Sequence, residues 1–187
     1  KPRSPGESYL SGAVKRRRET CKTVKDHREF VKFIVAFLIY NDGILMTINF
    51  AAIFGAVMFG LEQQALLLFM IVIQVTSIVG AYVSGYMTEW IGNKRTLVVF
   101  ILLMLASVLG LFLNESVPGF FIVGGVAGLA LSAVQSVSRG MIAVLSPEGR
   151  SAEFYGFFAV AGRTSSFIGP TIYGIVAAEA AYWFQSQ

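Results

Sequence analysis

The chain has 187 residues, of which 55% are hydrophobic and 14% charged, and its mean hydropathy is +0.66. Soluble domains carry about 25% charged residues, and a soluble domain of this size cannot bury so much apolar surface. The composition excludes a disordered chain, a nucleic-acid-binding domain and a disulfide scaffold, and it predicts a protein that lies in the lipid bilayer.

The chain also offers little for catalysis. Its one cysteine, Cys21, cannot form an internal disulfide, and its one histidine, His27, leaves little for a histidine-based metal site or a Ser-His-Asp triad. It has no Walker motif. We therefore expect a protein that is not an enzyme, with no catalytic residues, no metal site and no cofactor.

Residues 1–29 form a basic segment rich in Pro, Gly and Ser, and we expect it to be a mostly disordered cytoplasmic loop. Ten of the fifteen Lys and Arg residues fall within the first 32 positions. Such a segment either is a solvated loop that fixes topology or touches anionic headgroups through 15–18. Because the chain begins with Lys1 rather than Met, we expect an excerpt of a longer protein.

Five apolar stretches follow, each long enough to cross a bilayer as a helix. The predicted spans are about 33–59, 64–87, 96–113, 117–145 and 154–178, within a bundle covering 30–187. The loops alternate in basic charge: they are basic around residues 89–95 and 146–153, and free of Lys and Arg around 60–63 and 114–116. By the positive-inside rule, the basic loops are cytoplasmic and the chain alternates across the membrane.

The loop between the second and third spans carries the most specific motif. The stretch from Gly85 to Arg95, GYMTEWIGNKR, resembles the loop signature of the major facilitator superfamily, Gly-x-x-x-Asp-Arg-x-Gly-Arg-Arg. Gly85 is expected to permit close helix approach, Gly92 a tight turn, and Glu89 to need a cationic partner, while Lys94 and Arg95 hold the loop in the cytoplasm. The chain departs from the signature at Glu89, Trp90 and Asn93.

Other motifs resemble one branch of that superfamily, the vacuole-effluxer-like family, which includes an autophagy-linked amino-acid exporter. They are YNDG at 40–43, QSVSR at 135–139, EFYGFF at 153–158 and GRTSSFIGP at 162–170. The resemblance implies an all-α membrane protein of the major-facilitator type, with five helices (seven to eleven) of a six-helix half. It also implies that the N-terminal half of the same protein is missing from this chain.

Asp42 is the first candidate for a working residue, because a carboxylate deep in a membrane span is costly unless it serves a function or a partner. It is expected to couple protons or to bind a substrate ammonium, with Asn41 as a hydrogen-bonding neighbour. Arg163 lies at a similar predicted depth and suits a carboxylate-bearing substrate. The alternative is a structural Asp42–Arg163 pair. We expect the two to pair in one conformation and to separate in another.

Two further sets of polar residues lie in the spans. Gln135 is expected to line a substrate path, although interhelical hydrogen bonding is the more common use of such a residue. Arg139 and Glu89 lie near the cytoplasmic ends of their helices, and they form a charge lock in one interpretation. In the other, Arg139 reaches the headgroups.

The sequence therefore predicts a multi-pass secondary transporter of small polar solutes, in which amino acids are favoured by the family resemblance alone. Its partners are the lipid bilayer, a small-molecule substrate and the missing half, and not nucleic acid. The membrane is the plasma membrane if the source is bacterial, and a vacuolar or endomembrane if it is eukaryotic. The alternatives are a non-transporting scaffold or sensor with the same fold, and a channel, which the sparse polar residues disfavour.

Overall fold

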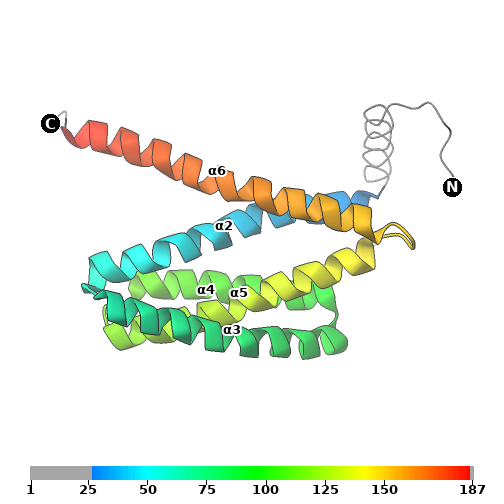
Figure 1. Cartoon of the computed structure of the whole chain (residues 1–187), viewed down its shortest axis with the longest axis horizontal. Helices are drawn as coiled ribbons and strands as arrows, with labels where there is room; N and C mark the ends of the chain where they lie inside the picture. Colours follow the sequence, from blue (N-terminus) through cyan, green and yellow to red (C-terminus); the bar gives the residue numbers. More distant parts are fainter. Residues whose placement is uncertain (1–26, 186–187) are drawn as a thin grey trace, which may run out of the picture.

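A computed structural model describes residues 27–185 as five helices in chain order (Figure 1). They are α2 (Arg28–Phe59), α3 (Gln63–Ile91), α4 (Asn93–Leu113), α5 (Val117–Leu145) and α6 (Ser151–Gln185). The five predicted spans each correspond to one helix, and α2, α3, α4 and α6 extend a few residues further. The expectations for the basic segment, apart from its last three residues, lie outside the described residues.

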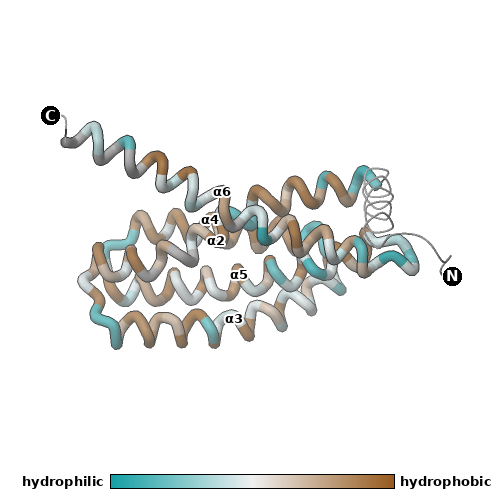
Figure 2. The backbone as a smooth tube through the Cα atoms, turned by 45° about the horizontal axis from the view of Figure 1, so that its top comes forward, coloured by the Kyte–Doolittle hydropathy of each residue, from teal (hydrophilic) through white to brown (hydrophobic). Residues whose placement is uncertain are grey.

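The helices run up and down, so that the connections gather at two opposite ends (Figure 1). The start of α2 and the α3–α4 and α5–α6 connections lie at one end, and this is the end that carries Lys94, Arg95 and Arg150. The basic residues of the described chain thus favour one side, as the predicted alternation requires. Figure 2 shows hydrophilic residues mainly near helix ends and hydrophobic ones along the helices.

Four segments are long and apolar enough to cross a membrane: Arg28–Thr47, Gln63–Ile91, Asn93–Leu113 and Val117–Leu145. The shortest complete helix among them, α4, has 21 residues, or about 30 Å of length, which matches the hydrocarbon thickness of a bilayer. The chain is therefore an all-α, multi-pass membrane protein. The span over 154–178 is helical as part of α6, and its membrane crossing stays a prediction.

The turns between helices follow from local chemistry. Gly60 ends α2 in a left-handed conformation (φ 60°), and Gly92 joins α3 to α4 at φ 82°. Glycine adopts such positive φ values without steric penalty, and this is the property for which a glycine was expected at position 92. At the start of α5, the Ser116 side chain accepts a hydrogen bond from the Gly119 N–H, as a capping serine does.

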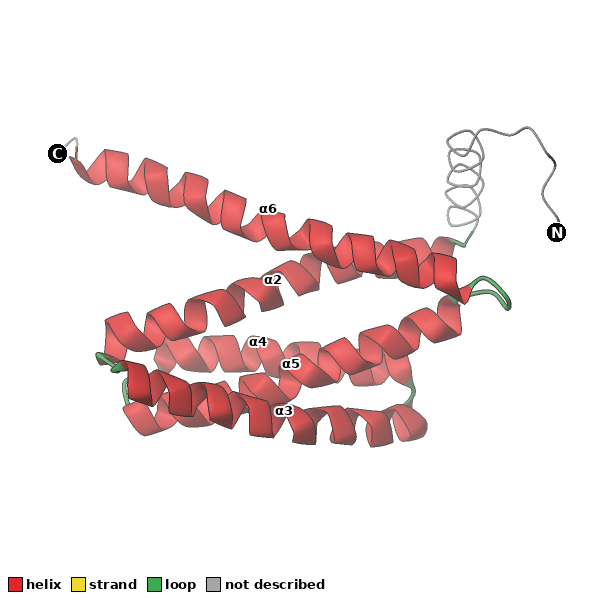
Figure 3. Cartoon of the chain, viewed as in Figure 1, coloured by secondary structure: helices red, strands yellow, loops and turns green. Residues whose placement is uncertain are grey.

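The five helices divide into two groups (Figure 3). The helices α3, α4 and α5 pack closely together, with α5 against both of the others, while α6 packs mainly against α2. The α3–α5 contact depends on glycine: a Cβ at Gly80 would meet the Leu129 carbonyl, and a Cβ at Gly124 would meet the Phe69 ring. Small residues allow this approach of backbones in membrane bundles.

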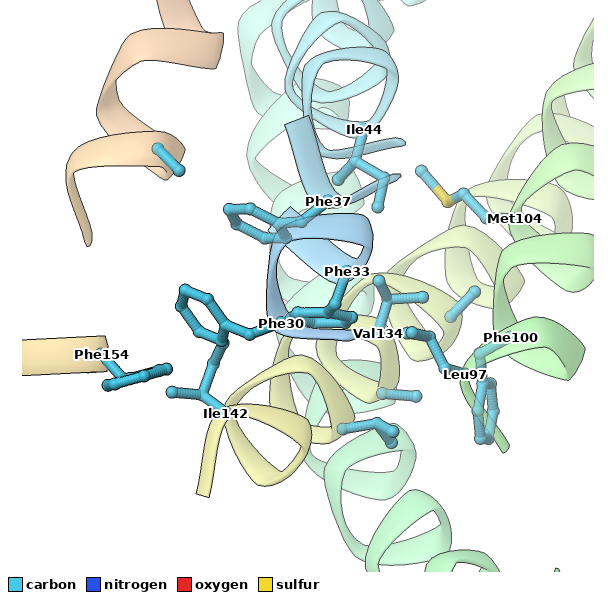
Figure 4. Packing of buried hydrophobic residues seen from close by; sticks show 14 residues of the cluster. Phe30, Phe33, Phe37, Ile44, Leu97, Phe100, Met104, Val134, Ile142 and Phe154 are labelled. Atoms are coloured by element: carbon cyan, nitrogen blue, oxygen red, sulfur yellow. The ribbon is translucent and has the colours of Figure 1, made fainter. Parts of the chain in front are cut away.

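A buried hydrophobic cluster joins the two groups near the end that carries the α5–α6 connection (Figure 4). The Phe154 ring of α6 packs edge-on to Phe30 of α2, with ring centroids 4.5 Å apart, and both are almost fully buried. Ile142 of α5 is also fully buried in this cluster, and α4 adds Leu97 and Phe100. The start of α6 is therefore fixed to the rest of the bundle.

Candidate functional site

Three consecutive residues of α2 make hydrogen bonds to other helices at mid-length. Tyr40 is bonded to α5, whereas Asn41 and Asp42 are bonded to α6. Successive helical positions point about 100° apart, so the three side chains together can contact both α5 and α6. The YNDG motif thus places α2 as the connection between α5 and α6.

Asp42 accepts a hydrogen bond from the backbone N–H of Gly169, with 2.8 Å between Oδ1 and the amide nitrogen. The carboxylate is half-buried. A hydrogen bond to an ionised acceptor is stronger than a neutral one, with a net worth of about 1.5–3 kcal/mol. A backbone amide of α6 therefore supplies part of the stabilisation that a carboxylate within a membrane helix needs.

The neighbouring bonds are between side chains. The Asn41 amide donates to the Ser165 hydroxyl at 2.6 Å, and Ser165 in turn donates to the Gly162 carbonyl at 2.9 Å. The Tyr40 and Ser138 hydroxyls are 2.7 Å apart. Ser138 and Ser165 are fully buried, so these bonds satisfy polar groups that would otherwise be costly in an apolar setting.

Arg163 lies on a different side of α6 from the residues that contact α2. It is two positions from buried Ser165, which corresponds to about 160° around the helix, and its side chain is exposed. The partner of Asp42 is Gly169, so the structure does not join Asp42 to Arg163. Gly169 is six positions beyond Arg163, or about 9 Å along α6 and about 120° around it. A direct pair would therefore require α6 both to rotate and to shift along its axis.

Arg163 instead borders an open groove of about 590 Å³ along α6. The described residues that line it are all on this one helix: Val160, Arg163, Thr164, Phe167, Thr171 and Ile172. The two threonine hydroxyls donate to carbonyls of their own helix, Thr164 to Val160 at 2.9 Å and Thr171 to Phe167 at 2.6 Å. The guanidinium is therefore the main hydrogen-bond donor on this face.

The candidate residues of α5 are also exposed. Gln135 and Arg139 both lie on the outer surface of the helix, one turn apart. The backbone carbonyl of Arg139 accepts a hydrogen bond from the Tyr155 hydroxyl at 3.0 Å, which ties the start of α6 to α5. Gln135 is exposed, and its role in a substrate path stays a prediction.

Arg139 and Glu89 do not form an ion pair with each other in this structure. Both side chains are exposed, and the ion pairs described for 27–185 are Lys32–Glu29 and Arg150–Glu153. Lys94 and Arg95 are exposed beside the α3–α4 turn, as expected. The lock remains a prediction for another conformation.

No other described helix of this chain approaches Gly85, because nothing lies within 4 Å of a Cβ built there, so its predicted role in close approach stays a prediction. The glycine of α3 that permits close approach is Gly80, and the sequence reasoning missed it. It also assigned no role to Gly169, where a Cβ would lie 2.6 Å from Met46 Cγ and 2.8 Å from Asp42 Oδ1. Both glycines lie in apolar stretches, and helical periodicity alone does not say which glycine meets a neighbour.

Comparison with known proteins agrees with this architecture. Residues 1–181 match the model of the family described as vacuole effluxer Atg22 like. The chain belongs to this family. The match includes the YNDG motif, the GYMTEWIGNKR loop and the residues that join α2 to α6, so the family resemblance and the major-facilitator fold class predicted from the sequence are confirmed.

Two relatives of the vacuole-effluxer family illustrate the match. An uncharacterized MFS-type transporter of Bacillus subtilis, YxiO, is 26% identical over 165 residues, which cover 88% of this chain and 38% of that protein. Autophagy-related protein 22-1 of Neosartorya fischeri is 27% identical over 183 residues, 90% of this chain and 30% of that protein. The chain thus spans about a third of the length of these relatives. No solved structure matches it.

Proposed function

We propose that this chain forms part of a secondary active transporter that moves small polar solutes by alternating access. The observation that carries the proposal is the exposed Arg163 in the middle of α6, beside an open groove. A guanidinium within a membrane helix faces protein or a water-filled path rather than lipid. The relatives named as MFS-type transporter and vacuole effluxer support the same conclusion.

The outer surface of α4 supports a placement in which α4 faces lipid and Arg163 does not. Beyond Lys94 and Arg95 in its first turn, the exposed large side chains of α4 are apolar: Val98, Val99, Leu102, Leu105, Leu109, Phe112 and Leu113. Such a surface suits lipid tails. With α4 toward lipid, the faces of α5 and α6 that carry Gln135 and Arg163 turn toward the remaining half of the protein, which would complete the groove.

In this proposal, Arg163 binds an anionic group of the substrate. A guanidinium matches a carboxylate in a bidentate geometry, and amino acids are the substrates favoured by the family resemblance. Asp42 works on the other side of α6, through the α2–α6 contact, so we assign the two residues separate tasks. We also propose that the direction of transport is efflux, across a vacuolar membrane or a plasma membrane.

The test is uptake and efflux of labelled amino acids by the full-length protein in proteoliposomes, with and without a proton gradient. Arg163→Gln should abolish transport, and Arg163→Lys should retain part of it. Arg150→Gln is the matched control, because Arg150 lies in the loop before α6 and should leave transport unchanged. If the folded protein moved no labelled solute with or without the proton gradient, the scaffold or sensor alternative would be supported.

A further inference from the structure

The part of α6 around Gly169 is a weak point in an otherwise continuous helix. Pro170 lies inside α6, and a proline there has no N–H to donate and crowds the carbonyl four residues earlier. The preceding N–H, that of Gly169, is engaged from outside the helix by Asp42. Pro170 thus lacks its bond in the regular ladder of α6, and the N–H just before it has an acceptor outside the helix.

Packing changes at the same point. Before it, α6 buries Phe154, Ala161, Ser165 and Gly169, whereas all residues from 170 to 176 are exposed. Beyond Gly169, contact with α2 includes the ring pair Phe50–Tyr173, with centroids 4.4 Å apart. Figure 1 shows α6 lying close to α2 near its start and diverging from it toward the C-terminal end. The first part of α6 is anchored, and the second part projects from it.

Asp42 is attached at the boundary between these two parts. Its contact requires glycine, because a Cβ at position 169 would lie 2.8 Å from Oδ1 and equally close to the Met46 sulfur. The contact joins a side chain of α2 to the backbone of α6, so its geometry is transmitted directly to the helix axis. A side-chain partner would not constrain the axis in this way.

We propose that Asp42 is a positioning residue, which holds the Gly169 amide next to Pro170 and thereby sets the angle at which the outer part of α6 leaves α2. The outer part, residues 170–185, moves about this point, and the anchored part with Arg163 does not. This inference concerns the helix angle and stands apart from the substrate proposed above.

The experiment measures distances between pairs of spin labels in the full-length protein, in a cysteine-free background. The outer pair is Val57 and Tyr182, both 75% exposed. The inner pair is Val35, also exposed, and Ala159. Because Tyr182 lies about 20 Å along the helix from Gly169, a change of about 10° displaces it by about 3 Å.

Asp42→Leu, which lacks an acceptor, should shift and broaden the outer distance and leave the inner one unchanged. Asp42→Asn keeps a carbonyl oxygen that accepts the amide hydrogen, so it should restore the parent distance. Gly169→Ala should resemble Asp42→Leu. Gly174→Ala is the matched control, since nothing lies within 4 Å of a Cβ there, and it should leave both distances unchanged.

Transport gives a second readout. A residue that sets the helix angle should change the turnover in Asp42→Leu, with little change in the substrate concentration at half-maximal rate. The proposal fails if Asp42→Leu and Gly169→Ala both keep the parent outer distance. It also fails if Asp42→Asn behaves like Asp42→Leu, because the acceptor oxygen would then not be what matters. Neither result depends on which solute is carried.

Discussion

Two helix contacts of this protein, α3–α5 and α2–α6, are built from different residues. Between α3 and α5, glycines bring the backbones together, and Ser77 and Ser132 donate to carbonyls across the contact, Ser77 to Gly128 at 3.0 Å and Ser132 to Ser77 at 2.5 Å. Between α2 and α6, longer polar side chains make the bonds.

The difference suggests that the two contacts differ in rigidity. A backbone contact filled by small residues has few alternative arrangements, because packed interiors resist small displacements. The hydrogen bonds that Asn41 and Asp42 make with α6 hold it at single points, about which the outer part of α6 can change its angle. The α3–α5 contact is therefore suited to a rigid support, and the α2–α6 contact to a joint in the proposed transport cycle.

The largest expected loss of stability follows from a change at the anchored start of α6. Phe154→Ala removes a ring that is fully buried against Phe30 and Ile142, and such truncations cost about 3–5 kcal/mol. Thermal unfolding of the purified full-length protein measures it. Phe167→Ala is the control, because Phe167 is 73% exposed and should change stability little. Equal effects of the two variants would mean that α6 is not anchored at Phe154.

The next largest loss of stability is expected from overpacking the α3–α5 contact. Gly80→Leu places a side chain where even a Cβ would meet the Leu129 carbonyl and the Ser132 hydroxyl, and overpacking of this kind costs about 1–3 kcal/mol or more. Gly85→Leu, on the same helix with nothing within 4 Å of its Cβ, should leave the unfolding temperature nearly unchanged. A stable Gly80→Leu protein would show that α3 and α5 can separate.

Loss of the hydrogen bond that connects α2 to α5 should reduce the stability by a smaller amount. Tyr40→Phe removes the bond to Ser138 and keeps the ring, and a hydrogen bond of this kind contributes about 1 kcal/mol. Ser138→Ala is its partner variant. The double variant should cost less than the sum of the two single ones, since the residues share one interaction. Strict additivity in thermal unfolding would mean that the bond contributes nothing.

Much of the fold follows from the sequence because length, apolarity and loop charge are local properties. They place all five helices and the alternation of the loops, and positive φ at Gly92 follows from its position in a short turn. The face on which a residue lies is different. Asp42 and Arg163 have similar predicted depths, yet contacts between distant segments put Gly169, and not Arg163, against the carboxylate.

The smallest expected effect lies inside the rigid support. Ser132→Ala removes a hydroxyl that donates to the Ser77 carbonyl, and interhelical hydrogen bonds in membranes average about 0.6 kcal/mol. Because the glycine contacts around it remain, we expect a slight loss of stability and unchanged transport. Asn41→Leu removes one comparable bond, to Ser165, but should slow transport. If Ser132→Ala slowed transport as much as Asn41→Leu, the α3–α5 contact would also move during the cycle, and the distinction between support and joint would be lost.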